Sequence, residues 1–246
     1  MKEIDNQTKD KRSKKYNDWA RKRPAYIFLA ISIFFAVVMG VNEIVATKTW
    51  MRALTYLLSL SAIGTALFFL LMFIFRGIGK ACPEKLLFCD RLKPTNRLLY
   101  TDDDCYTEEK KNEIRKKIKA KKNIDLLKFK TKTYKNKKYV KRVDEAVSWL
   151  LDVTRFDEIL FEYNCIYGFW RNLTAALLIE SLFLFGLAAV NKWVFVLPFG
   201  NAFIWLAAIV LLISVWTTFV TYKNGMVFAK RVYDVFMNLN DDNQNY

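Results

Sequence analysis

The chain has 246 residues, of which 53% are hydrophobic, yet it carries 39 Lys and Arg against 24 Asp and Glu. A soluble domain intersperses apolar and cationic residues, so an excess of both indicates that they are segregated along the chain. The absence of histidine removes the commonest general base and the commonest metal ligand. Phosphate-loop, dinucleotide-binding and nucleophile-elbow motifs are absent too. We therefore expect a protein that is not an enzyme and has no cofactor, catalytic residue or metal site.

The apolar residues fall into four runs that are almost free of charge: Ala25 to Val45, Ala53 to Phe75, Leu173 to Val190, and Asn201 to Tyr222. At about 1.5 Å of rise per residue, each run matches a hydrocarbon core roughly 30 Å thick. Buried helices of a large soluble core rarely repeat at this length. The sequence predicts four transmembrane helices in two hairpins.

The cations predict the orientation of these spans. Thirty-six Lys and Arg lie in the amino-terminal arm, in the segment between the hairpins and in the carboxy-terminal tail, whereas only Lys48, Arg52 and Lys192 lie at the two short connections. Positive charge is retained on the cytoplasmic side. We expect a multi-pass protein with both termini in the cytoplasm.

The predicted organisation has five parts. A basic cytoplasmic arm (residues 1–24) precedes the first hairpin (25–75), and a basic cytoplasmic insert (76–172) precedes the second (173–222). A cytoplasmic helix and tail follow (223–246), with Met226, Ala229, Tyr233 and Phe236 or Met237 on one face. The fold class is a mainly α membrane protein with an α+β insert.

Within the insert, three elements are predicted from periodicity. The pattern from Glu108 to Asn123 favours a helix, and the alternation of Leu127, Phe129, Thr131 and Thr133 with lysines favours a strand. Apolar residues then recur every three to four positions from Val143 to Tyr167, which is typical of one long amphipathic helix running toward the third span.

The strongest charge signal lies in this insert. Sixteen Lys or Arg occur between Lys110 and Arg142, with only Glu113 and Asp125 as acids. A solvated charged face normally mixes both signs, so this run predicts a polyanionic partner. Aromatic residues interleaved with the lysines, as Phe129, Tyr134 and Tyr139 are, are typical of single-strand binding. Anionic lipid headgroups and a merely solvated basic domain are the alternatives; lipid-binding clusters lie directly beside a span, as the amino-terminal arm does.

In the third predicted span, Glu180 has no Lys or Arg in any span to pair with it. A lone carboxylate in hydrocarbon is costly, so it either faces an aqueous lumen or a subunit seam, or is hydrogen-bonded between helices. Four spans enclose little more than their own side chains, so a pore would require a homo-oligomer. Glu180 is therefore a pore candidate.

The carboxylates of Asp102, Asp103 and Asp104 precede a predicted helix. Capping of the free N–H groups at that helix start, by an Asp or a Thr, is the favoured interpretation, and a metal-binding triad is the alternative. The four cysteines lie in the cytoplasmic segment and are expected to be reduced thiols.

Two segments carry a resemblance to a known family. KPTNRLLYTDDD opens the insert and YGFWRNLTAALL leads into the third span. Together with two hairpins flanking a cytoplasmic insert, they resemble small membrane effectors of bacterial antiphage defence, in particular the Hailong protein A family. The resemblance implies an oligomeric ion channel in the bacterial inner membrane that acts by abortive infection. It also implies a cytoplasmic crown that binds a short single-stranded DNA made by a partner nucleotidyltransferase, and that loss of the DNA opens the channel.

If the basic insert corresponds to the crown, the resemblance implies that its cations contact phosphates. These cations are Lys128, Lys130, Lys132, Lys137, Lys138, Lys141 and Arg142. Phe129 and Tyr134 are the stacking candidates. Pro94, Thr95, Arg97 and Leu98 match the first motif, in either a folding or a binding role. Two other functions remain open: a membrane tether for nucleic acid or a CRISPR accessory protein without a pore, and a lipid-acting enzyme that uses Asp102 to Asp104.

Overall fold

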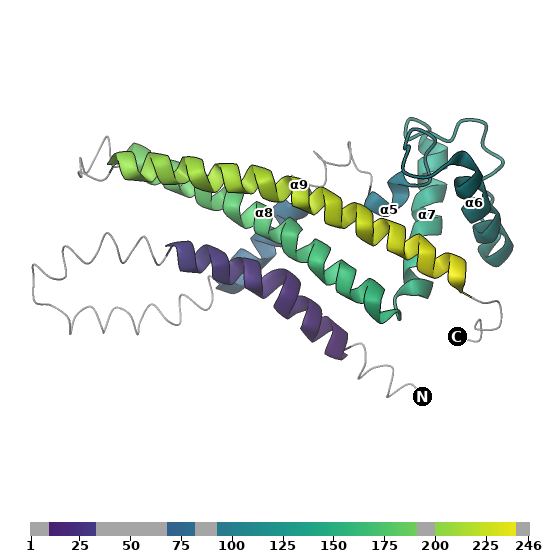
Figure 1. Ribbon diagram of the computed structural model, residues 1–246, viewed down its shortest axis with the longest axis horizontal. Coiled ribbons are helices and arrows are strands. Elements are labelled where there is room, and N and C mark those ends of the chain that lie inside the picture. Colours follow the sequence, from purple (N-terminus) through teal and green to yellow (C-terminus); the bar gives the residue numbers. More distant parts are fainter. Residues whose placement is uncertain (1–9, 33–67, 82–92, 191–199, 240–246) are drawn as a thin grey trace, which may run out of the picture. The chain divides into compact units, whose positions relative to one another are not determined.

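The computed structural model describes residues 10–32, 68–81, 93–190 and 200–239, and for residues 200–202 only the backbone (Figure 1). Helix covers residues 10–32, with a π-helical segment η1 (Asn17–Lys22), and residues 68–81. The other helices are α5 (Pro94–Arg97), α6 (Glu108–Lys122), α7 (Lys137–Thr154), α8 (Glu158–Val190) and α9 (Gly200–Asn238). The chain divides into a first unit, residues 1–83 and 168–220, and a second unit, residues 84–167 and 221–246.

Two of the described helices, α8 and the α9 segment Phe203–Asn238, are long and apolar enough to cross a membrane, judged by length and composition. Helices α8 and α9 contain the third and fourth predicted spans. In α9, Trp205 is 71% exposed and Leu212 is 70% exposed. Large apolar side chains exposed in such number favour a hydrocarbon environment. Most of the first two predicted spans, the short connections and the end of the tail lie outside the described residues.

The first unit packs the helix of residues 10–32 and that of residues 68–81 with parts of α8 and α9. One cluster joins Leu173, Leu177 and Leu184 of α8 to Phe203 and Ala207 of α9. A second cluster brings together Ala25, Phe68, Phe75 and Ala175. The Asn172 side chain donates to the Ala20 carbonyl, so polar bonding as well as apolar packing joins these helices.

The second unit has its own hydrophobic core. Ile114 and Ile118 of α6 and Val143, Val147 and Leu150 of α7 are buried in it. The C-terminal part of α9 contributes Met226, Ala229, Val232, Tyr233 and Phe236 to the same core. The apolar face predicted after the fourth span therefore packs in this core. It belongs to α9 itself and is not on a separate helix.

The helix predicted from Glu108 is confirmed, since α6 spans Glu108–Lys122. Its N-cap is Thr107, whose side chain accepts a hydrogen bond from the Lys110 N–H. Asn123 ends the helix in the left-handed conformation, with φ of 57°, which asparagine tolerates better than most residues.

The strand predicted over residues 127–133 is wrong, because the described part of the second unit contains no strand. Turns replace it: the Asp125 carboxylate accepts hydrogen bonds from the Leu127 and Lys128 N–H groups at 2.9 and 3.2 Å. Such local bonds compete with a β-ladder. The nearest approach to a ladder is one bond from the Thr101 N–H to the Lys132 carbonyl.

The single helix predicted from Val143 to Tyr167 is also wrong, because residues 155–157 separate α7 from α8. The Asp157 carboxylate accepts from the Leu160 N–H at 2.6 Å and caps the start of α8. From Glu158 onward the helix runs into the third predicted span, as expected.

Candidate nucleic-acid interface

The nominated binding residues lie on the connection between α6 and α7 and on the first turns of α7. Ile124 and Leu126 are buried in the core of the second unit and anchor the connection. Asp125 adds an ion pair, with its Oδ2 2.5 Å from Lys119 Nζ. This hydrogen bond from Lys119 lowers the pKa of Asp125 below its ordinary value. The connection is therefore tied to the core although it lacks regular structure.

At its other end, the connection is fixed by Asn136, the N-cap of α7. Its Oδ1 accepts from the Lys138 and Tyr139 N–H groups at 3.2 and 3.3 Å, and its Nδ2 donates to the Thr131 carbonyl at 2.9 Å. One side chain thus starts the helix and holds the turn before it.

Replacing Asn136 with alanine is expected to destabilise the protein by about 1 kcal/mol through the lost cap. Chemical denaturation of the full chain in detergent, followed by circular dichroism, measures this. The matched control is Asn123→Gly, where glycine accepts the left-handed backbone and stability should change by less than about 0.5 kcal/mol. Equal effects of the two substitutions would contradict the capping role.

The cations of the nominated set face solvent. Lys128, Lys130, Lys137, Lys138 and Lys141 are exposed, and Lys132 is half-buried. The seventh cation, Arg142, is exposed too, but its Nη1 lies 2.7 Å from Glu145 Oε2. Five exposed lysines on an anchored scaffold could contact successive phosphates.

The two stacking candidates differ in exposure. Tyr134 is 45% exposed, so one face of its ring could accept a base. Phe129 is half-buried against the core, with its ring centroid 5.4 Å from that of Tyr139 in an edge-on contact. Tyr139 is fully buried, which excludes it from stacking. Part of the Phe129 side chain therefore packs in the core.

Three cations of the basic run have structural roles and are not among the predicted ligand contacts. Arg115 is fully buried and donates to the Leu99 carbonyl at 2.7 Å and to Tyr139 Oη at 3.2 Å. Buried Lys111 donates to the Asp103 carbonyl. Lys117 donates to the Met237 carbonyl at 2.7 Å, beside the C-terminus of α9, where a cation is favourable.

A signal for two of these was present in the sequence. Lys111, Ile114, Arg115 and Ile118 are spaced as i, i+3, i+4 and i+7 and so share one helix face. Cations on an apolar face indicate paired, buried charges rather than ligand contacts.

The segment that carries the first motif of the resemblance is mostly buried. Thr95 is buried, and its carbonyl accepts a hydrogen bond from Tyr233 Oη at 2.7 Å. Leu98 lies in the core, Pro94 begins α5 at a position that suits proline, and Arg97 is half-buried. These contacts favour the folding role over the binding role.

Asp102, Asp103 and Asp104 lie in different environments. Asp103 is buried, accepts a hydrogen bond from the Cys105 N–H, and lies 2.5 Å from Arg97 Nε. Asp102 and Asp104 are exposed. Thr107, rather than an aspartate, caps the helix. Among the described residues, no group of three Asp, Glu, Cys or His could hold a metal ion.

Glu180 lies in α8 within the first unit and is fully buried. Ser32 Oγ donates to its carboxylate at 3.1 and 3.3 Å. Nearby on α8, Thr174 Oγ1 donates to Thr217 Oγ1 of α9 at 3.1 Å. A polar partner from another helix of the same chain favours the interhelical hydrogen bond over the pore-lining alternative.

The two helices flanking the candidate interface have opposite charge patterns. The first turn of α6 carries Glu108 and Glu109 and its last turn carries lysines, which complements the helix dipole. The first turn of α7 has no acid and begins with Lys137 and Lys138, and its last turn has no cation. The N-terminus of α7 therefore concentrates positive charge without compensation.

The described residues thus define a helical protein with two helices fit to cross a membrane and a basic surface at the start of α7. No family model, curated protein or solved structure matches this chain.

Proposed function

We propose that the protein is an oligomeric four-span channel effector of antiphage defence, gated by a short single-stranded nucleic acid. The ligand binds the basic surface of the cytoplasmic insert, and a partner nucleotidyltransferase supplies it. The protein resides in the bacterial inner membrane with both termini in the cytoplasm. The resemblance of the two sequence motifs supports the channel, its ligand, its partner and the inner membrane. The charge distribution supports the orientation of the termini.

The observation that carries the proposal is the charge at the start of α7. Lys137 and Lys138 add to the positive end of the helix dipole, an arrangement that is unfavourable unless an anion binds there. Sites that break a local rule of stability are commonly functional. Among the described residues, Lys130, Lys137 and Lys138 have no acidic partner. A phosphate backbone would supply the missing negative charge.

An oligonucleotide fits this surface better than a bilayer does. Exposed Tyr134 follows exposed Lys128 and Lys130 along the connection, and alternating cations and aromatic faces suit phosphates and bases of one strand. A lipid-binding patch needs no aromatic side chain between its cations.

The α8 helix offers a route from ligand to gate. Its residues up to Tyr167 belong to the second unit and those from Gly168 to the first. A ligand can shift the gate only by its difference in affinity between the closed and open forms. Displacement of the α7–α8 corner by a bound strand would provide such a difference.

The binding step is tested on protein purified in detergent from its native host. Copurifying nucleic acid is detected by absorbance and nuclease digestion, and labelled single strands are rebound across a salt series. About five phosphate contacts should give a slope near −3.5 in a plot of log affinity against log salt. Absence of any bound strand, with retention on anionic lipid instead, would overturn the proposal.

The double substitution Lys137→Gln with Lys138→Gln should reduce this slope by about 1.4, since two phosphate contacts are lost. The matched control is Lys116→Gln with Lys122→Gln, which removes two exposed cations from α6. The control should keep the slope close to that of the unsubstituted protein. Equal losses in both double variants would mean that only net charge matters.

A second candidate is a membrane tether for nucleic acid without a pore. The hydrogen bond from Ser32 to Glu180 favours it, because a carboxylate with a partner inside the chain no longer requires an aqueous lumen. A tether predicts no ion flux under any condition, whereas the channel predicts flux that changes when the strand is removed.

A further inference from the structure

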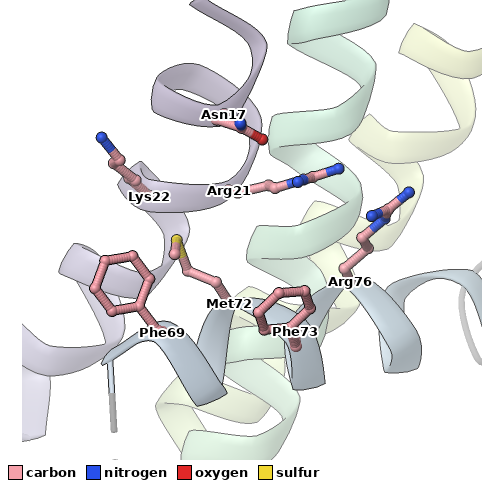
Figure 2. A pocket seen from close by; sticks show the side chains of 7 residues that line it. All are labelled: Asn17, Arg21, Lys22, Phe69, Met72, Phe73 and Arg76. Carbon is pink, nitrogen blue, oxygen red and sulfur yellow. The ribbon is translucent and has the colours of Figure 1, made fainter. Parts of the chain in front are cut away.

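A small pocket lies in the first unit between the helix of residues 10–32 and that of residues 68–81 (Figure 2). Its volume is about 220 Å³, which suits a headgroup rather than an oligonucleotide. One helix contributes polar and cationic groups and the other mainly apolar ones. The lining residues are Asn17, Arg21, Lys22, Phe69, Met72, Phe73 and Arg76.

Two arginines dominate the charge of this pocket. Figure 2 shows the side chains of Arg21 and Arg76 reaching from the two helices toward the same side. Burial and the nearby charge of Arg76 lower the pKa of Arg21, and Arg171 of α8 acts in the same direction. Like charges in one pocket repel each other, and an anion bound between them would remove this repulsion.

The hydrogen bonding of Arg21 is incomplete. Its Nε is buried and has no hydrogen-bond partner in the part of the chain that the structure describes. A buried donor without an acceptor costs free energy, and its fork of N–H groups suits a phosphate. Lys22, by contrast, is paired with Asp18, whose Oδ1 lies 2.6 Å from its Nζ.

The local backbone contributes to this arrangement. Asn17, Arg21 and Lys22 all lie in the π-helical segment η1, where the Arg23 N–H donates to the Asp18 carbonyl five residues earlier. The wider turn brings residues four and five apart onto one face, and such segments are frequent at functional sites. Gly168 of α8 permits the close packing here, since a Cβ at that position would lie 2.7 Å from Tyr16 Oη.

The apolar wall indicates the source of the phosphate. Phe69 and Phe73 are 48% and 67% exposed, and both line the pocket with Met72. The pocket also lies at the ends of the first two apolar runs, beside the basic arm, where acyl chains and headgroups meet. A free phosphate would gain nothing from this wall, whereas a lipid would use both parts.

We propose that Arg21 and Arg76 form a binding site for the phosphate of an anionic phospholipid, whose acyl chain lies against Phe69, Met72 and Phe73. The site orders the cytoplasmic ends of these two helices. The proposal requires that the first unit lies in a membrane and does not depend on oligonucleotide binding.

The test uses the full chain in nanodiscs and native mass spectrometry of lipid retained after transfer to detergent, with phosphatidylglycerol and phosphatidylcholine as probes. We expect phosphatidylglycerol to be retained preferentially. Arg21→Gln and Arg76→Gln should each lower apparent affinity about tenfold, the effect of one charge-assisted hydrogen bond. The control Lys11→Gln with Lys14→Gln removes two cations from the same helix outside the pocket and should retain the lipid.

Two further experiments distinguish the charge of the arginines from their geometry, and a lipid ligand from free phosphate. Arg21→Lys with Arg76→Lys keeps the charge but loses the fork, and should bind less well than the unsubstituted protein. Equal retention by the arginine variants and the control would overturn the proposal. Inorganic phosphate is also tested as a competitor, with sodium chloride of equal ionic strength as its control. Displacement of the lipid by phosphate but not by chloride would overturn the lipid assignment and indicate a free-phosphate site. Melting temperatures in phosphatidylcholine nanodiscs confirm that each variant is folded.

Discussion

Replacing Arg115 with alanine is expected to destabilise the second unit by about 3 kcal/mol or more. Arg115 is a large side chain, fully buried, and donates to Leu99, Tyr139, Asn112 and Glu108. Truncation removes these hydrogen bonds and leaves a cavity among apolar residues. Denaturant unfolding of the full chain in detergent, followed by tryptophan fluorescence, measures the change.

The control is Arg142→Ala, which removes the same charge from the same basic run. Arg142 is exposed and pairs with exposed Glu145, so its loss should cost less than about 1 kcal/mol. Arg115→Lys keeps the charge without the fork and should lie between the two. If Arg115→Ala unfolds at the same denaturant concentration as Arg142→Ala, the buried network is not a stabilising element.

Replacing Phe236 with alanine should have an effect of similar size, about 3 to 5 kcal/mol. Phe236 is fully buried where α9 joins the core of the second unit, and its ring centroid lies 5.7 Å from that of Trp149 in an edge-on contact. The loss combines a cavity with a broken aromatic pair. Denaturant unfolding of the full chain in detergent, followed by circular dichroism, measures the change.

The residue-matched control is Phe156→Ala, since Phe156 is 44% exposed in the corner between α7 and α8. It should cost less than about 1 kcal/mol. A large effect of both substitutions, or of neither, would contradict the division between core and surface in this unit.

The helices were the most predictable elements. The third and fourth spans follow from uninterrupted apolar runs, and both lie within helices fit to cross a membrane. Their full lengths were not predictable from hydropathy, because α8 and α9 continue through amphipathic sequence into the second unit. There tertiary packing, rather than apolar length, sustains the helix.

The strand prediction was wrong because local hydrogen bonds form turns there. Alternation of lysine with Leu127 and Phe129 has the period of a strand, but a strand also needs a neighbour to pair with. Asp125 and Asn136 instead satisfy the backbone through turns. Both residues were visible in the sequence as turn and capping types, and weighing them against seven alternating positions would have corrected the prediction.

The candidate interface was predictable only as a charge excess. Composition could not separate buried Arg115 and Lys111 from the exposed lysines of α7, because that distinction depends on which helix face meets the core. Nor could it separate Tyr139, which is buried, from Tyr134, which is exposed. The pocket at Arg21 depends on two helices whose packing no periodicity reveals.

Ion flux shows whether a bound strand sets the gate of a channel. Protein purified with its copurifying nucleic acid is reconstituted into liposomes with the second unit outside, and flux of an entrapped ion is followed before and after nuclease treatment. For a gated channel, we expect flux to change when the strand is digested and rebinding of a labelled strand to reverse the change. Absence of flux in both states, with the strand bound normally, would contradict the channel and leave the tether as the function.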